Sequence, residues 1–270
     1  MPGDWGMHNL IYSPTHIRIF NINLKGFYAY PLLPEWGNAE WLLNSLRSIV
    51  FKLNSLRNEI IVSKTINMVK MVKQTNVPYN GSAMDIGYHS ITIGNQYYRG
   101  QRDCAKRLQQ LTQYIDFKGK VVFDVGCCIG GMLFPLSRII NKGIGIDHNI
   151  NDINAANRLV SVQNCHNISF YIFDLEKDPL AQIENMYDTH IDITFLLSVC
   201  LWIKNWMQVI KYIHILSHIL IIETNGTAEQ QKEKLDYVSM LYDEVITVSN
   251  ISDDDPSQKN RAMYICKRRQ

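Results

Sequence analysis

The chain has 270 residues, a formal net charge of +2 and 19% charged residues. This length suits one α/β domain of ordinary size with an extension, and it is too short for two full enzyme domains. The near balance of charges excludes a strong overall field for nucleic acid or for an acidic substrate, although local basic stretches can still act. The composition therefore indicates one α/β core and leaves its ligand open.

The six cysteines include no C-x-x-C pair, and most of them lie in or beside apolar, strand-like runs. Such cysteines are expected to be reduced and buried, as in an intracellular protein. The N-terminal sequence MPGDWGMHNL has an acid where a secretory signal carries positive charge, and no stretch approaches the ~20 apolar residues of a membrane span. We therefore expect a cytoplasmic protein without a membrane span.

Residues 1–95 are expected to form an N-terminal extension, with a long amphipathic helix near 38–73 and then a polar loop over 74–95. The helix carries a heptad seam over residues 42–60, made of Leu42, Leu46, Ile49, Leu53, Leu56 and Ile60. Basic residues outnumber acids along this helix. Three roles are open: packing on the chain's own core, self-association into a homo-oligomer, or docking on an anionic surface such as lipid or RNA. Upstream, the alternating run THIRIFNINLK is typical of a strand pair.

From residue 118 onward, apolar strand-like runs alternate with helical patterns. Strands are predicted at 120–124, 143–147, 167–174, 191–198, 218–224, 244–250 and 261–267. Helices are predicted between them at 130–140, 151–164, 178–186, 205–217 and 227–242. This order predicts an α/β fold with a seven-stranded, mostly parallel, doubly wound sheet. Because only ISDDDPSQKN separates the last two strands, they are predicted to form an antiparallel terminal hairpin at the sheet edge.

The stretch VVFDVGCCIGGMLFPLS, residues 121–137, predicts a buried strand, a glycine-rich turn and a helix start. Backbone N–H groups and a positive helix end converge at such a turn, which is typical of a nucleotide site. A dinucleotide fingerprint would use Gly126, Cys128 and Gly131, so its middle glycine is missing, and Asp124 would lie unfavourably near a pyrophosphate. S-adenosylmethionine fits better, because it has no phosphate and Asp124 can oppose its ammonium group.

Asp147 ends the second predicted strand of this region. Its carboxylate is placed to accept both ribose hydroxyls of S-adenosylmethionine, while Gly126 and Gly130 let the turn approach the methionyl and ribose groups. An acid at this position also suits a nicotinamide cofactor, and it can instead cap the helix that follows. Asp147 alone therefore does not discriminate between the ligands.

Residues 118–267 resemble the class I S-adenosylmethionine-dependent methyltransferases. The first motif of that family is an acid followed by Gly-x-Gly-x-Gly. It stands here as Asp124-Val-Gly126-Cys127-Cys128-Ile-Gly130, with Cys128 in place of the middle glycine. The acids that follow the second and third strands in the family match Asp147 in GIGIDHN and Asp174 in YIFDLEKDPL. The seven-strand order with its terminal hairpin is a second match.

The resemblance implies S-adenosylmethionine as the cofactor of a methyltransferase domain over residues 96–270. In the family, the acid at Asp174 binds the adenine amino group and the next N–H, of Leu175, reaches the ring. Upstream of the core, Arg102 is placed to pair with the methionine carboxylate and a tyrosine to lie against the sulfonium, unless this is a solvated helix start. The predicted cofactor contacts are Asp124, Gly126, Cys127, Gly130, Asp147, His148, Asp174, Leu175, Ser198, Tyr98 and Arg102.

Methyl transfer is an in-line displacement, so the protein mainly aligns the reacting groups and excludes water, without need of a metal. An oxygen nucleophile needs a base. Glu223, at the end of the fifth strand, is the predicted catalytic base, with His89 and His148 as alternatives. Trp202 and Lys204 can line the binding site of a polar acceptor. Alternatively, Trp202 can belong to the core.

The N-P-P-[YFW] tetrad of many nitrogen methylations is absent after the fourth strand, which favours an oxygen nucleophile. The predicted activity is therefore O-methylation of a small-molecule or glycan acceptor. RNA is a further candidate because of the basic helix, although no aromatic and basic platform for RNA is present. The non-enzyme alternative is a catalytically silent Rossmann-like interaction protein.

Overall fold

The computed structural model describes residues 18–19, 22–23, 39–71, 86–251 and 261–269. The chain divides into two compact units, residues 1–61 and residues 62–270. The described residues 86–95 belong to the larger unit, and the boundary at residue 95 stays a prediction.

The first unit contains two short strands and most of a long helix. Strands β1 (Arg18–Ile19) and β2 (Ile22–Asn23) pair antiparallel within the run that predicts a strand pair. Helix α1 (Ala39–Met71) follows, close to its predicted bounds. Its last turns belong to the larger unit, where Thr65 and Val69 are buried. Within the described ranges, no helix is both long and apolar enough to cross a membrane.

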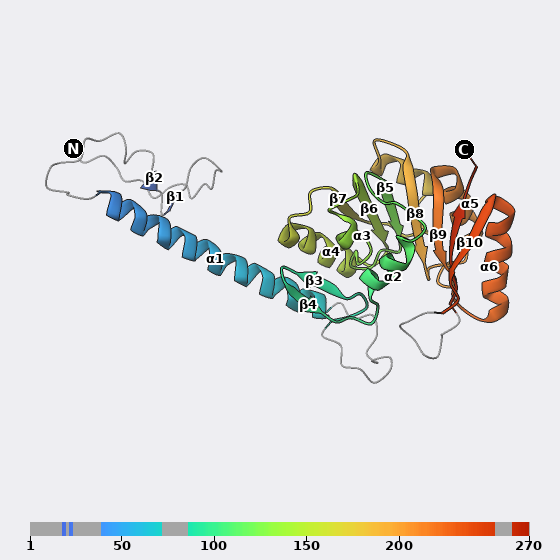
Figure 1. Cartoon of the computed structure of the whole chain (residues 1–270), viewed down its shortest axis with the longest axis horizontal. Coiled ribbons are helices and arrows are strands. Elements are labelled where there is room, and N and C mark those ends of the chain that lie inside the picture. Colours follow the sequence, from blue (N-terminus) through green and yellow to red (C-terminus); the bar gives the residue numbers. More distant parts are fainter. Residues whose placement is uncertain (1–17, 20–21, 24–38, 72–85, 252–260, 270) are drawn as a thin grey trace. The chain divides into compact units, whose positions relative to one another are not determined.

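A seven-stranded sheet forms the centre of the larger unit, in the order β10-β11-β9-β8-β5-β6-β7 (Figure 1). Neighbouring strands from β9 to β7 run parallel, whereas β11 is antiparallel to both β9 and β10. The predicted mostly parallel sheet and its antiparallel terminal hairpin are thus confirmed. The strands are β5 (Val121–Val125), β6 (Lys142–Asp147), β7 (Ile168–Ile172), β8 (Ile191–Leu197), β9 (Ser217–Glu223), β10 (Glu244–Ser249) and β11 (Met263–Lys267).

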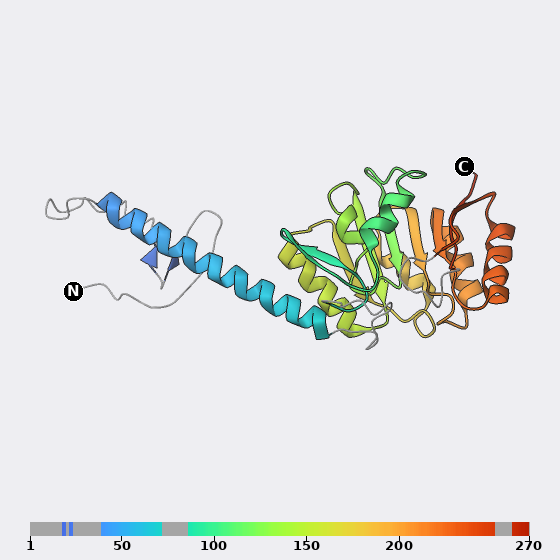
Figure 2. The same ribbon diagram turned by 60° about the horizontal axis from the view of Figure 1, so that its bottom comes forward.

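Helices cover both faces of this sheet (Figures 1 and 2). On β5, Val122 packs in one apolar cluster with α2, α3 and α4, whereas Phe123 and Val125 pack in a second cluster with α5 and α6. Burial on both faces explains why β5 reads as an unbroken apolar run rather than as an alternating one. The helices are α2 (Cys104–Leu111), α3 (Leu133–Leu136), α4 (Ile150–Gln163), α5 (Trp206–Leu216), α6 (Ala228–Leu241) and the 3₁₀ helix η3 (Leu180–Met186).

The helix predicted over 130–140 is much shorter in the structure, where α3 spans Leu133–Leu136. Pro135 has no N–H to donate to the preceding turn. The N–H groups of Ser137 and Ile139 instead bond carbonyls three residues back, at 3.2 and 2.9 Å, which is 3₁₀ geometry. The chain therefore passes from the glycine-rich turn to β6 by a series of tight turns.

A hairpin of β3 (Ile91–Ile93) and β4 (Gln96–Tyr98) precedes α2. Ile91 and Ile93 face the core, as alternate residues of one strand do. The loop predicted over 74–95 therefore contains a strand at its end, and its earlier part lies outside the described residues.

Candidate functional site

A cavity of about 810 Å³ lies at the carboxyl ends of β5, β6, β7 and β8. Parallel strands bring these ends to one edge of the sheet, and open α/β sheets bind their ligands there. Part of the predicted cofactor set lies on the cavity wall, namely Gly126, Asp147, His148, Asp174, Leu175 and Ser198.

Packing fixes the glycines of the turn after β5. Gly126 and Gly130 have φ angles of +75° and +81°, in the region that side chains disfavour. A Cβ atom on Gly130 would collide with the Phe170 ring, and one on Gly126 with Val199. Gly130 and the buried Cys127 are not on the cavity wall. Gly130 and Cys127 therefore serve to pack the turn against its neighbours.

Asp147 joins the glycine-rich turn to the start of α4. Its Oδ2 accepts the Cys128 N–H at 2.9 Å and its Oδ1 accepts the Asn149 N–H at 2.9 Å. His148 Nδ1 lies 3.3 Å from the same Oδ1. Cys128 adopts a φ of +52° at the position of the missing middle glycine, and its N–H bond to Asp147 stabilises that conformation. Asp147 therefore has a structural role as well as a place on the wall.

Asp124 is a buried acid with an unpaired oxygen. The residue is 2% exposed and is not on the cavity wall, and its Oδ2 has no hydrogen-bond partner among the described residues. Burial, and next the Asp147 carboxylate, raise the pKa of Asp124 to about 8. A cation that reached Asp124 would favour its ionised form and would satisfy this oxygen.

Asp174 and Leu175 follow β7 on the cavity wall. The Asp174 carboxylate is 2.7 Å from Lys177 Nζ and accepts the Glu176 N–H at 3.0 Å. The hydrogen bond from Lys177 lowers the pKa of Asp174. Asn205 Nδ2 donates to the Leu175 carbonyl at 2.6 Å, which ties this loop to the start of α5.

Glu223, at the end of β9, is buried and receives four donors. Arg102 donates through Nη2 to Oε1 at 2.6 Å and through Nη1 to Oε2 at 3.2 Å. Arg107 Nη2 donates to Oε2 at 2.9 Å, and the Ser198 hydroxyl donates to Oε1. A carboxylate offers about four acceptor positions, so this one is fully used. The geometry favours a positioning role for Glu223 over that of a base.

Ser198 connects the Glu223 cluster to the cavity wall, because it bonds Glu223 and itself lies on that wall. It has a φ of +60°, a strained value for a residue with a side chain. Its N–H donates to the Glu223 carbonyl at 3.0 Å, and its own carbonyl accepts from Asn225 Nδ2 at 2.6 Å. Asn225 Oδ1 also accepts the Leu201 N–H at 3.1 Å. These bonds fix the backbone from which the wall after β8 is built.

The segment before α2 reaches the cavity through residues other than those predicted. Tyr88 and Gln101 lie on the wall, whereas Tyr98 packs in the core beside α2. The Arg102 side chain is 1% exposed and also donates from Nε to Tyr88 Oη at 3.1 Å. In this structure, Arg102 thus binds protein groups behind the wall.

His89 is buried against the glycine-rich turn. Its Nδ1 accepts the Gly131 N–H at 3.3 Å. Burial, and next Arg102, lower the pKa of His89 to about 3, so the ring is neutral at physiological pH. This nitrogen already holds a backbone donor, which leaves it poorly placed as a base.

Comparison with solved structures identifies the architecture. The N-terminal domain of EvdMO1, crystallised with SAH bound, superposes with a TM-score of 0.56 over 79% of this chain and 97% of that domain, at 12% identity. WbdD, named a bifunctional kinase-methyltransferase, superposes with a TM-score of 0.53 over 76% of this chain and 41% of its own, at 17% identity. The chain has the class I methyltransferase fold.

Sequence comparison adds one curated relative and no matching family model. The 23S rRNA (uracil(1939)-C(5))-methyltransferase RlmD of Histophilus somni (strain 129Pt) is 28% identical over 102 residues. The match covers 34% of this chain and 23% of RlmD, so the chain spans less than a quarter of that relative.

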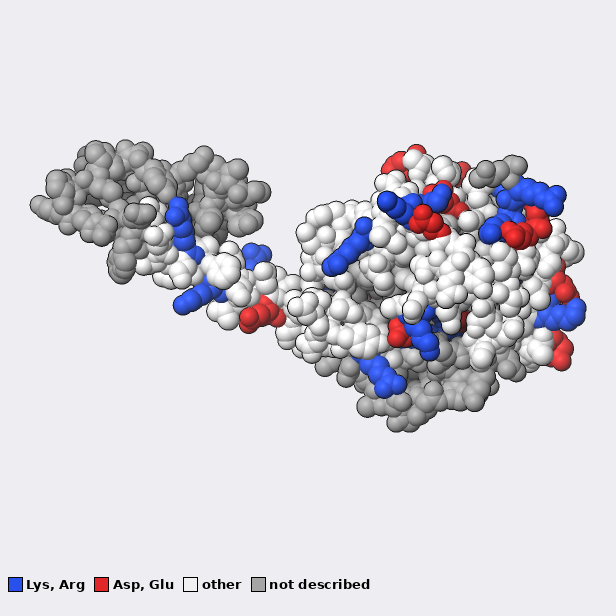
Figure 3. Space-filling model, viewed as in Figure 1, with Lys and Arg blue, Asp and Glu red and all other residues white. Residues whose placement is uncertain are grey.

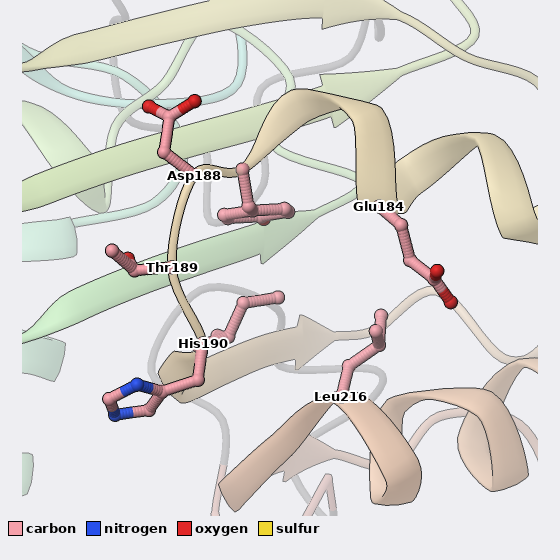
Figure 4. Close-up of a pocket in the computed structure, with 7 residues that line it drawn as sticks. Glu184, Asp188, Thr189, His190 and Leu216 are labelled. Atoms are coloured by element: carbon pink, nitrogen blue, oxygen red, sulfur yellow. The ribbon is translucent and has the colours of Figure 1, made fainter.

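A smaller hollow of about 280 Å³ lies at the opposite edge of the methyltransferase sheet, before β8 and β9 (Figure 4). Its polar groups do not converge. Asp188 pairs with Lys142 at 2.9 Å, Glu184 accepts from Tyr212 at 2.9 Å, and His190 points away from both. The hollow therefore offers no arrangement for chemistry.

Several residues of the site escape prediction from sequence, among them Tyr88, Gln101 and Arg107. Arg107 lies 116 positions from Glu223 in the chain, and no local pattern reports such a pair. The run GQRDCAKR gives a partial signal, because it places Arg107 on the buried face of α2, where an arginine needs an acidic partner.

Proposed function

We propose that this chain is an S-adenosylmethionine-dependent methyltransferase that acts at the 810 Å³ cavity. The observation that carries the proposal is the unpaired Oδ2 of Asp124, which is buried and not on the cavity wall and which the ammonium group of S-adenosylmethionine would satisfy on reaching it. Asp147 ends β6 and Asp174 follows β7, the next two strands at the same edge of the sheet. Both carboxylates of this pair lie on the cavity wall. The SAH bound to the EvdMO1 domain supports the same choice of ligand.

The residues present suit the ribose and the adenine of this cofactor. Each Asp147 oxygen accepts one backbone N–H, so each keeps a lone pair for a ribose hydroxyl. The Leu175 N–H and the Asp174 carboxylate suit the adenine edge, which has both an acceptor and a donor. When bound, the cofactor supplies a methyl group on a charged sulfur. The protein's task is then to orient the acceptor in line and to exclude water.

For the acceptor, we propose a hydroxyl of a sugar or of a related small molecule. The EvdMO1 domain has been crystallised in the presence of D-fucose as well as SAH, which supports a sugar. Trp202 also supports it, because the residue lies on the cavity wall and is 77% exposed. An indole offers a flat apolar face with a polar N–H at its edge. The match to RlmD favours RNA as the second candidate.

Glu223 enters this proposal as a positioning residue. To accept a proton from the acceptor, its carboxylate would have to release one of four donors, three of which come from the guanidinium groups of Arg102 and Arg107. Its bonds to Ser198 instead fix the wall next to the reacting groups.

Calorimetry tests the cofactor. We expect S-adenosylmethionine and S-adenosylhomocysteine to bind the full chain, and Asp147→Asn to weaken both. NAD serves as the matched ligand, because it also carries a ribose diol but adds a pyrophosphate. Binding of NAD without binding of either sulfur compound would overturn the proposal.

Transfer of a labelled methyl group tests the acceptor. The protein is incubated with labelled cofactor and, in parallel, with free sugars, nucleotide-linked sugars, a glycan-lipid fraction and RNA. Label in a sugar-containing fraction supports the proposed acceptor. Label in RNA alone would replace it, and label in none of them, with cofactor bound, would favour the silent interaction protein.

A further inference from the structure

Helix α1 presents a stripe of exposed aliphatic side chains. The heptad seam defined above runs along it from Leu42 to Ile60 in steps of four and three residues. Four of its described side chains are about half exposed: Ile49 at 49%, Leu53 at 46%, Leu56 at 54% and Ile60 at 55%. Large aliphatic residues in a continuous stripe of this kind mark an interaction surface.

The seam ends where the helix begins to pack on its own core. Beyond Ile60, the buried positions are Thr65 and Val69, at 0% and 1% exposure, with Val62 and Ile66 against the same core cluster. The residues of α1 that contact the larger unit are therefore different from the residues of the seam. Packing on the chain's own core, the simplest role for the helix, accounts for its last turns and leaves the seam without a described partner.

We propose that the seam pairs with the same seam of a second copy of this chain, as a two-stranded coiled coil. Steps that alternate between four and three give a seven-residue repeat, which keeps a stripe facing another helix. A lipid surface imposes no such repeat and favours a wider apolar face. The steps run four, three, four, three, four, which is the same from either end. Each seam residue thus meets a seam residue of the second copy in a parallel or an antiparallel pair.

Charges beside the seam decide little about this pairing. In a parallel pair, Glu59 of one copy would lie opposite Lys64 of the other, which attracts, while Lys52 would lie opposite Arg57, which repels. These contributions nearly cancel, so association depends on burial of the seam. Basic side chains prevail over acidic ones along α1 (Figure 3). This excess limits the stability of the pair at low salt, because exposed like charges repel each other.

The test compares the mass of the full chain with that of two variants by light scattering over a range of concentrations. We expect a dimer for the parent and half that mass for Ile49→Asp with Leu53→Asp. Phe51→Asp is the matched control, because Phe51 is 77% exposed and lies half a turn away from the seam. It should stay dimeric. Circular dichroism and S-adenosylhomocysteine binding would show that the fold survives in each variant.

Several outcomes would contradict the proposal. A parent chain that stays monomeric as its concentration rises has no second copy on the seam. A double variant that remains dimeric places the contact elsewhere. If the parent is monomeric and floats with vesicles of anionic phospholipid, and the double variant does not, the occupant is a membrane surface. Because the mass does not depend on catalysis, failure here leaves the proposed methyltransferase activity untouched.

Discussion

Arg102 and Glu223 form a buried, two-point ion pair between the segment before α2 and the end of β9. Arg102 Nη2 lies 2.6 Å from Glu223 Oε1, and Nη1 lies 3.2 Å from Oε2. Arg107 adds a third contact at 2.9 Å. The pair links residues 121 positions apart in the chain. Glu223 also bonds Ser198, which lies on the cavity wall, so the pair supports one side of that wall. Disruption of this pair should therefore lower the stability of the protein more than it impairs the catalytic step.

Glu223→Gln should destabilise the protein by about 3 to 5 kcal/mol, because it leaves two buried guanidinium groups without a carboxylate. Urea denaturation measures the change. Glu233→Gln on the exposed face of α6 is the control and should shift stability by less than about 0.5 kcal/mol. If Glu223→Gln keeps its stability and its cofactor affinity but loses turnover by roughly 100-fold or more, Glu223 is the base.

The stability of the unliganded protein should depend on pH through Asp124. Its pKa is about 8 when folded, against about 4 for an ordinary aspartate. Between these values, the folded protein holds a proton that the unfolded chain has released. Stability from this group therefore falls as pH rises, by at most about 1.4 kcal/mol per pH unit. Asp124→Asn should flatten the dependence, as followed by denaturation at several pH values. An equal slope in both proteins would refute the shift.

Cofactor binding should release the same proton, because the ammonium group of the ligand stabilises ionised Asp124. The affinity for S-adenosylhomocysteine should then increase as pH rises from about 6 to 7.5, by up to tenfold per unit. Calorimetry in buffers of different ionisation enthalpy counts the proton directly. Asp124→Asn should bind more weakly and without proton release. Proton release that persists in this variant would point to another group.

Asp147→Asn should weaken cofactor binding by about 2 to 4 kcal/mol, or roughly 30- to 1,000-fold, through loss of a charged pair of bonds to the ribose. The variant keeps one side-chain oxygen for the Cys128 or Asn149 N–H, so its fold should survive with reduced stability. Calorimetry with S-adenosylhomocysteine and a melting curve together measure both effects. Parental affinity in a folded variant would confine Asp147 to its structural role.

Trp202→Ala should weaken binding of the acceptor and leave cofactor binding unchanged, since the side chain is largely exposed at the wall. We expect a rise in KM of about 10-fold, the scale of one lost stacking contact, and near-parental behaviour for Trp202→Phe. Steady-state kinetics on the labelled acceptor gives the KM of both variants. A fall in cofactor affinity instead would place the indole beside the adenine.

The sequence by itself determined which segments form strands, their succession along the chain and the edge at which the acids meet. Strand-length apolar runs such as VVFDV can be read locally, because a strand covered on both faces needs apolar residues at successive positions. Once the strands are parallel, acids at their carboxyl ends, such as Asp147 and Asp174, must lie at one edge. These positions follow from residue order alone.

Only the tertiary structure decided which side chains face the cavity and which charges they carry. The sequence pattern places Arg102 near a ligand, but packing buries it against Glu223, and Tyr88 and Gln101 take the wall instead. The proton on Asp124 likewise depends on how completely the fold removes water from its carboxyl group. Burial and pairing over more than a hundred residues are properties of the packed chain, whereas local patterns report only periodicity, turns and caps.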